Sequence, residues 1–223
     1  IIITTTDSQD TMLGLLESIK RQTFRDIEII VVDNCSTDKT KEFAKNFTKL
    51  IFDKGPERSV QRNFGAKKSR GEYLLFLDSD MILSENVVKK CIEKIKNKKL
   101  KINIGGIVIP EKSFGQGMWA KAKILEREIN IGEAFFESAR FFPKNIFWEF
   151  KGYDEMLTGP EDWDLPQRIR KSYKIVRANS LILHNEKKLS LETLYKKKYY
   201  YGLSTHKYLE KHKLPIISAT TIY

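Results

Sequence analysis

The chain has 223 residues, of which 41% are hydrophobic and 31% charged, a balance that is ordinary for a globular protein. The formal net charge of +11 suits an anionic partner, which could be nucleic acid, an anionic membrane or an acidic small substrate. No run of about 18 apolar residues occurs, so we expect no membrane-spanning helix. The two cysteines, Cys35 and Cys91, form no disulfide framework, and a reduced, cytoplasmic setting fits them.

Strands and helices are predicted to alternate through the first hundred residues, because apolar runs alternate with amphipathic segments. Strands are predicted at 1–6, 27–33, 50–53 and 72–78, and helices at about 10–22, 36–47, 58–71 and 84–97. Ser36 is the expected N-cap of the second helix, and Gly71 is the expected end of the third. This alternation favours a parallel, doubly wound sheet with right-handed crossovers.

The second half of the chain is less regular. Strands are predicted at 102–110, 138–143, 173–178 and 180–184, and helices at 115–131, 161–173 and about 190–211. Without repeats or a convincing linker, the pattern indicates one α/β domain over residues 1–187. Its sheet should be Rossmann-like, mostly parallel and flanked by helices. Residues 188–223 should add a basic, tyrosine-rich helical extension.

Two acids end the most apolar strand, in the segment YLLFLDSDMIL at 73–83. The carboxyl ends of strands in an open α/β sheet line the ligand crevice. Asp78 and Asp80 would face the same side, where two carboxylates repel each other unless a cation joins them. Mg²⁺ and Mn²⁺ take oxygen ligands and often bind substrate phosphates as well. The alternative is that both acids cap the helix that begins near Ser84.

Four segments carry a family resemblance, and they follow in order as IIITTTD, IEIIVVDNCSTDKT, RNFGAKKSRGEYLLFLDSD and KGYDEMLTGPEDWDLPQRIRKSYKI. Over roughly residues 1–187 the chain resembles the inverting family 2 glycosyltransferases, which have a GT-A fold and use nucleotide sugars. The DxD motif alone is weak, whereas the ordered set with the downstream acidic block is strong. The resemblance implies a nucleotide-sugar half at 1–100 and an acceptor half at 101–187. It also implies transfer of a single sugar, because the Gln-x-x-Arg-Trp motif of processive relatives is missing.

Site residues follow from the resemblance position by position. Those implied for contact with the donor are Thr4, Thr6, Asp7, Asp33, Asn34, Arg62, Asp78 and Ser79. Those implied as ligands of Mn²⁺ or Mg²⁺ are Asp78, Asp80 and His184. Asp162 would be the general base, with Glu161 as the other member of the catalytic acid pair. The alternatives are a solvated helix charge for Arg62 and a structural role for His184.

The donor and the acceptor are less well defined. The family usually has Pro-Thr-Tyr-Asn and Asp-Asp-Gly-Ser where this chain has Thr4-Thr5-Thr6-Asp7 and Asp33-Asn34-Cys35-Ser36. These departures leave the base open, with a UDP-sugar favoured and a GDP-sugar as the second choice. The acceptor is expected to be a hydroxyl or phosphate of a glycan or of a lipid-linked molecule.

The segment LYKKKYYYG at 194–202 is the densest basic cluster. Lysine with tyrosine suits an anionic membrane or a lipid-phosphate headgroup, which would place a cytoplasmic enzyme peripherally on the inner face of the membrane. Interleaved aromatic residues also suit nucleic acid, although no nucleic-acid partner is expected. The alternative is a solvated helix that closes the domain.

Other classes of protein predict different features. A sugar-nucleotide pyrophosphorylase should have a Gly-rich phosphate loop with a basic residue after the first strand, and TTTDSQDTM lacks one. A nucleic-acid-binding or phosphate-binding module without catalysis would not need Asp78, Asp80 or Asp162, and its binding would depend steeply on salt. The intact acids also argue against a catalytically dead scaffold.

Overall fold

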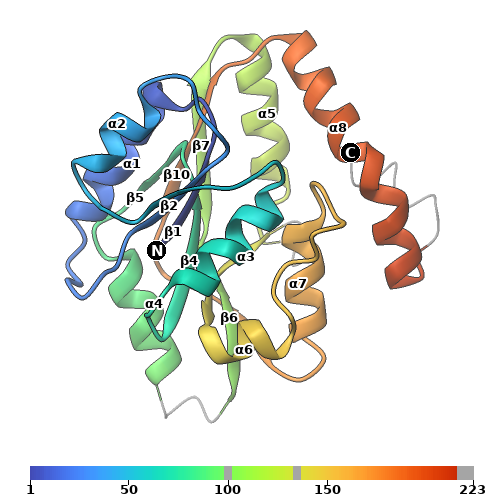
Figure 1. Cartoon of the computed structure of the whole chain (residues 1–223). Helices are drawn as coiled ribbons and strands as arrows, with labels where there is room; N and C mark the ends of the chain where they lie inside the picture. The colour runs from blue at the N-terminus through green and yellow to red at the C-terminus, as the bar shows by residue number, and fades with distance from the viewer. Residues whose placement is uncertain (98–101, 133–136, 215–223) are drawn as a thin grey trace.

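The computed structural model describes residues 1–97, 102–132 and 137–214 (Figure 1). Its main sheet has seven strands in the order β3-β2-β1-β4-β8-β6-β9. The strands are β1 Ile2–Thr5, β2 Ile30–Asp33, β3 Ile51–Asp53, β4 Tyr73–Asp78, β6 Ile104–Val108, β8 Ala139–Pro143 and β9 Lys174–Arg177. Only β8 runs antiparallel to its neighbours β4 and β6, so the predicted, mostly parallel α/β sheet is confirmed.

Helices cover both faces of this sheet (Figure 1). They are α1 Gln9–Lys20, α2 Thr40–Lys45, α3 Arg58–Lys68, α4 Val87–Lys96, α5 Met118–Ile129, α6 Lys144–Glu149, α7 Glu161–Ile169 and α8 Leu191–His212. Alternate strand residues face opposite sides: Ile3 packs in the cluster with α1, α2 and α4, while Ile2 packs with α3, α6 and α7. Cys91 belongs to the first cluster and is fully buried, as plain core.

A glycine brings α3 unusually close to the sheet. A Cβ on Gly65 would lie only 2.5 Å from Cγ2 of Ile2, so any larger residue would push the helix away from β1. The close packing carries the polar side chains of the same helix down to the ends of the central strands. Arg62 reaches the buried end of β4 in this way.

A small second sheet contains β5 Met81–Leu83, β10 Ile182–Lys188 and β7 Glu111–Gln116, in the order β5-β10-β7. The sequence indicated only the first part of β10. β5 follows the DSD segment directly, and its antiparallel register sets His184 opposite Met81. The backbone N–H of Asn185 donates to the Asp80 carbonyl at 2.9 Å. This pairing brings residue 184 to the loop at residues 78–80.

Several predicted boundaries are wrong. Ser36 does not cap α2; its backbone N–H and Oγ each donate to the Asp33 carboxylate at 2.6 Å. The helix begins only at Thr40, after Lys39. α3 ends at Lys68, because Ser69 is already extended. The first residues of the helix predicted at 115–131 belong to β7, and the short helix α6 was not predicted.

The predicted C-terminal helix is confirmed as α8, which begins after Ser190, whose side chain accepts a hydrogen bond from the Thr193 N–H. Its C-terminal half is fastened to the segment around α7. Ser204 Oγ donates to the Thr158 carbonyl at 2.7 Å, and Tyr208 is fully buried. His212 Nε2 lies 2.9 Å from Asp164 Oδ1. No helix within residues 1–97, 102–132 and 137–214 combines the length and the apolar composition needed to cross a membrane.

Candidate functional site

A cavity of about 740 Å³ opens at the carboxyl ends of β1, β2 and β4. That volume lies in the range of small-molecule binding sites. Side chains from α5, α7 and α8 and from the small sheet complete its lining. Of the residues implied by the family resemblance, eight line it: Thr4, Thr6, Asn34, Asp78, Ser79, Asp80, Asp162 and His184. The ends of separate strands therefore meet where the parallel sheet predicts.

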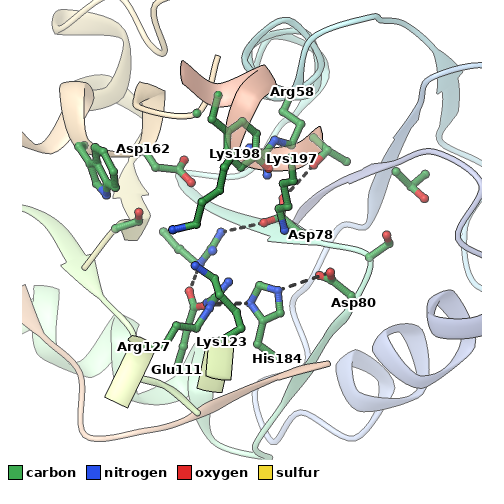
Figure 2. A pocket seen from close by; sticks show the side chains of 18 of the residues that line it. Arg58, Asp78, Asp80, Glu111, Lys123, Arg127, Asp162, His184, Lys197 and Lys198 are labelled. Atoms are coloured by element: carbon green, nitrogen blue, oxygen red, sulfur yellow. Dashed lines mark hydrogen bonds and ion pairs between the residues drawn. The ribbon is translucent and has the colours of Figure 1, made fainter. Parts of the chain in front are cut away.

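Four carboxylates, Asp78, Asp80, Glu111 and Asp162, form what we call the carboxylate floor of this cavity (Figure 2). Asp78 Oδ1 accepts from Arg62 Nη2 at 2.9 Å and from Thr4 Oγ1 at 3.2 Å. Its Oδ2 lies 3.5 Å from Arg140 Nη1. Burial alone would raise the pKa of Asp78, but the two arginines outweigh it and hold the pKa well below its usual value. Both oxygens of Asp78 are therefore occupied by cations of the chain.

Arg62 on α3 is completely buried. Besides Asp78, its guanidinium pairs with Glu161 at 3.3 Å and, through Nη1, with Asp162. Its central carbon also lies 5.2 Å from the ring centroid of Tyr153. The alternative of a solvated helix charge is wrong, because a buried arginine needs such partners. Arg62 lies behind the lining and links the acids of β4 and α7.

The catalytic acids implied by the resemblance stand in the first turn of α7, where the helix dipole favours negative charge. Asp162 lines the cavity, whereas Glu161 is buried behind it and pairs with Arg58 at 3.6 Å. Burial and the neighbouring Asp162 raise the pKa of Glu161. Only one carboxylate of the pair thus faces the space where a substrate would bind. Trp163 also lines the cavity and packs edge-on against Tyr208, with ring centroids 6.2 Å apart.

His184 lies between two floor carboxylates. Its Nε2 is 3.4 Å from Asp80 Oδ2, and its Nδ1 is 3.0 Å from Glu111 Oε2. Burial would lower the pKa of His184, but Asp80 and Glu111 raise it to about 9. Glu111 also accepts from Arg140 Nε at 2.5 Å and Arg127 Nη1 at 3.1 Å.

Asp80 and His184 fit a divalent cation as a pair of ligands. The Asp80 Oδ1 is buried without a hydrogen-bond partner, so its lone pairs are available. Glu111 would orient the imidazole through Nδ1, which is the usual arrangement behind a metal-binding histidine. In the described part of the chain, no three His, Cys, Asp or Glu side chains are grouped to hold a metal. Two protein ligands leave coordination positions for phosphate oxygens.

Residues at the ends of β1 and β2 divide into two sets. Thr6 lines the cavity, and its Oγ1 donates to the carbonyl of Asn34 at 3.2 Å. Asp7 and Asp33 do not line it. Asp7 Oδ1 accepts from the Thr37 N–H at 2.9 Å, and buried Asp33 holds the loop at residue 36. These two aspartates shape the rim, while Thr4, Thr6, Asn34 and Ser79 face the cavity.

Sequence reasoning missed the cationic side of the cavity. Four side chains from α5 and α8 form what we call the basic wall: Lys123, Arg127, Lys197 and Lys198 (Figure 2). Lys197 and Lys198 lie within the basic cluster noted in the sequence, but the cluster did not indicate which lysines turn inward. Lys123 and Arg127 are spaced i,i+4, so the helical period was a signal that they share a face.

Comparisons with known proteins identify similar sequences. The family model described as Glycosyl transferase family 2 matches residues 1–157. An uncharacterized glycosyltransferase of Haemophilus influenzae is 30% identical over 210 residues, which cover 86% of this chain and 70% of that protein. The GalNAc(5)-diNAcBac-PP-undecaprenol beta-1,3-glucosyltransferase of Campylobacter jejuni is 27% identical over 178 residues, or 72% of this chain and 56% of that protein.

Solved structures share the fold. Mannosyltransferase PcManGT from Pyrobaculum calidifontis, in complex with GDP-Man and Mn²⁺, matches 96% of this chain and 64% of its own with a TM-score of 0.71 at 14% identity. Staphylococcus aureus TarS 1–349 with UDP-GlcNAc matches 93% and 65% with a TM-score of 0.58 at 20% identity. The chain spans only 16% to 44% of the length of other curated relatives that it matches.

Proposed function

The chain belongs to glycosyl transferase family 2, and on that premise we propose that it is an inverting glycosyltransferase. It moves one sugar from a nucleoside diphosphate sugar to a hydroxyl or phosphate of a glycan or lipid-linked acceptor. One observation carries the proposal: a carboxylate with an unpartnered buried oxygen, Asp80, and a cavity-facing acid, Asp162, line the same cavity at the ends of the central strands.

The donor binds with its nucleoside at the ends of β1 and β2. Thr4, Thr6 and Asn34 offer hydroxyl and amide groups there, and Ser79 lies at the turn after β4. Asp78 lines the same cavity, and its carboxylate is paired with Arg62 and Arg140. The base is uracil or guanine, since structures of this fold hold UDP-GlcNAc in one case and GDP-Man in another. A UDP-sugar is the first donor to test.

Asp80 and His184 would hold Mn²⁺ or Mg²⁺, the Asp80 Oδ1 being buried without a hydrogen-bond partner. The cation would neutralise the charge that builds on the donor diphosphate as its bond to the anomeric carbon breaks. Asp162 accepts the proton of the acceptor hydroxyl while that oxygen attacks from the opposite face of the sugar. A single displacement of this kind inverts the anomeric configuration. Arg62 fixes the direction of the Asp162 carboxylate, and Glu161 stays buried behind it.

The outer face of α8 contacts an anionic membrane in this proposal. Tyr195 and Tyr199 are 68% and 63% exposed on successive turns, and Lys196 beside them is exposed too. Amphipathic aromatic rings with lysines suit the headgroup region, and the inner leaflet of a cell membrane is anionic. Such a contact brings a lipid-linked acceptor near the cavity, which the other face of α8 lines.

Calorimetric titration with UDP, GDP and dTDP, each with and without Mn²⁺, tests the donor site. We expect one nucleotide to bind tightly only with the metal, and Asp80→Ala to weaken that binding about 10- to 100-fold. Glu93→Ala is the matched control, because Glu93 is an exposed acid on α4 outside the cavity. The proposal fails if no nucleotide binds, or if binding is indifferent to both the metal and Asp80.

A further inference from the structure

Asp78 and Asp80 lie two residues apart, yet their carboxylates have different partners. Asp78 Oδ2 lies 3.5 Å from Arg140 Nη1, whereas Asp80 Oδ2 lies 3.4 Å from His184 Nε2. Glu111 joins these two partners, because its carboxylate contacts both Arg140 and His184. A continuous series of polar contacts therefore connects five side chains in the order Asp78, Arg140, Glu111, His184 and Asp80.

The two oxygens of Glu111 are held by different residues. Its Oε1 accepts from Arg140 Nε at 2.5 Å, and its Oε2 lies 3.0 Å from His184 Nδ1. Figure 2 shows the imidazole between Glu111 and Asp80. Contacts at both oxygens add geometric specificity, because they restrain the rotation of the carboxylate. The contact with Arg140 therefore helps to set the direction in which Oε2 meets the imidazole.

Two arginines contact Glu111, and Arg140 is the more firmly placed of them. The Arg140 side chain is 7% exposed, whereas that of Arg127 is 30% exposed. Arg127 Nη1 donates to Oε2, the oxygen that His184 also uses, and its Nε pairs with Glu186 at 2.8 Å. Arg140 contacts the opposite oxygen and so restrains the carboxylate on the side away from the imidazole.

The backbone of β8 gives Arg140 an unusual position. In the pairing of β8 with β6, Phe141 lies opposite Ile107. The next matched pair is Ala139 with Val108, so β8 has one residue more than β6 between the two pairs. That extra residue is Arg140, and an extra residue of this kind forms a β-bulge, which redirects a side chain. The bulge is a backbone reason for the inward position of Arg140, whose side chain lines the cavity.

We propose that Arg140 is a positioning residue of the divalent-cation site and that it acts through Glu111. Arg140 holds Glu111 in the orientation in which His184 Nδ1 donates to it, which leaves the Nε2 lone pair for the cation. Arginine has no acceptor group, so Arg140 cannot be a ligand itself. The inference rests on the proposed function and deepens it, because neither the pattern of acids in the sequence nor the family resemblance indicated Arg140.

Electron paramagnetic resonance measures Mn²⁺ binding directly, because the sharp signal of the hydrated ion weakens as the ion binds. Mn²⁺ is titrated into protein mixed with the nucleoside diphosphate that binds in the titrations above, with the nucleotide alone as the blank. We expect Arg140→Met and Glu111→Gln each to weaken the binding of Mn²⁺ by about tenfold or more, as the loss of groups that orient a metal ligand does.

A double variant tests whether Arg140 acts through Glu111. Arg140→Met/Glu111→Gln should bind Mn²⁺ within about twofold of Glu111→Gln alone, because two residues that act in series do not have additive effects. If Arg140→Met does not fold, Arg140→Lys takes its place. Lysine keeps the charge but not the separate N–H groups that contact Asp78 and Glu111, so Mn²⁺ binding should again weaken, by less than in Arg140→Met.

The matched control is Arg168→Met. Arg168 is 19% exposed and pairs with Asp164 on α7, and it is not among the residues that line the cavity. Its loss should lower the temperature of thermal unfolding and leave the affinity for Mn²⁺ as in the wild type. A general loss of stability is thereby separated from a loss of orientation at the cation site.

Three outcomes overturn this role of Arg140. Arg140→Met binds Mn²⁺ as the wild type does, or Arg168→Met weakens the binding as much, or the double variant shows the full product of the two single effects. The last result would mean that Arg140 acts independently of Glu111. Failure of the proposed function looks different, since the wild type itself would then bind no nucleotide in the first titration, or bind it without regard to Mn²⁺.

Discussion

The two sides of the cavity balance charge in opposite ways. On the carboxylate floor, acids at strand ends are paired with arginines that are themselves buried, such as Arg62 and Arg140. On the basic wall, flexible lysines stand on helices and share one partly exposed glutamate. Buried charges need fixed partners and cannot move without a large energetic cost, whereas lysines at a helix surface adapt to what approaches them. The two sides of the cavity therefore differ in how firmly their charges are held.

Replacing Asp162, the proposed base, should have the largest effect. Asp162→Asn keeps the size of the side chain but removes proton acceptance, so turnover should fall about 10²- to 10⁴-fold. Turnover is measured as the release of nucleoside diphosphate from the nucleotide sugar. The affinity for the nucleotide should not change. Asp53→Asn, at the exposed end of β3, is the control. Unchanged turnover in Asp162→Asn would remove this residue as the base.

Replacing Arg62, which links the floor carboxylates Asp78 and Asp162, should have the second largest effect. Arg62→Met leaves the carboxylates of Asp78, Glu161 and Asp162 near one another without their shared cation. The free energy of unfolding should fall by about 3–5 kcal/mol, as measured by denaturant titration. Arg70→Met removes an arginine that is 85% exposed and should cost at most about 1 kcal/mol. Equal losses in the two variants would contradict the difference between buried and solvated charge.

Asp164 anchors α8 through Lys211 and His212. Replacing Asp164 should have a smaller, pH-dependent effect on stability. Burial would raise the pKa of Asp164, but Lys211, Arg168 and His212 outweigh it and lower the pKa. A carboxylate with a lowered pKa stabilises the fold above its unfolded pKa of about 4, and that stabilisation is lost as pH falls through the folded value. Asp164→Asn should therefore cost about 2 kcal/mol at neutral pH, less than a fully buried pair because its cations are partly exposed.

Denaturant titrations of wild type and Asp164→Asn at several pH values measure this difference. The difference should be constant from pH 7 down to about 5 and shrink at lower pH. A difference that grew on acidification would have the wrong sign and would contradict the ion-pair account of the anchor.

Substitutions on the outer face of α8 should have the smallest effect, and this effect is on membrane binding. Tyr195→Ser/Tyr199→Ser removes two exposed rings, and co-sedimentation with vesicles that contain phosphatidylglycerol should weaken about tenfold or less. Phe114→Ser is the control, an exposed aromatic residue on β7. If the wild-type protein does not bind these vesicles, the membrane contact is refuted. That result would not bear on the residues of α8 that line the cavity.

The sequence predicted the floor better than the wall, for physical reasons. The floor lies where apolar strands end, and those ends are visible as an apolar run that stops at Asp78. Glu111 is the floor carboxylate that the sequence did not predict, and its partner Arg140 was not predicted either. Glu111 comes from β7, a polar, glycine-containing segment that pairs with β10. The Ser36 cap failed because the Asp33 carboxylate competed for the same hydroxyl. Tertiary contacts of this kind cannot be predicted from the hydrophobic periodicity of the sequence.

Hydrogen bonds fasten α8 to the segment around α7 on both sides of Asp162. Thr158 and Asp164 lie on either side of Asp162 in the chain, and both are bonded to α8. Asp162 therefore sits between two points of attachment to α8. A displacement of the C-terminal half of α8 would be carried to Asp162 through the segment at residues 158–164.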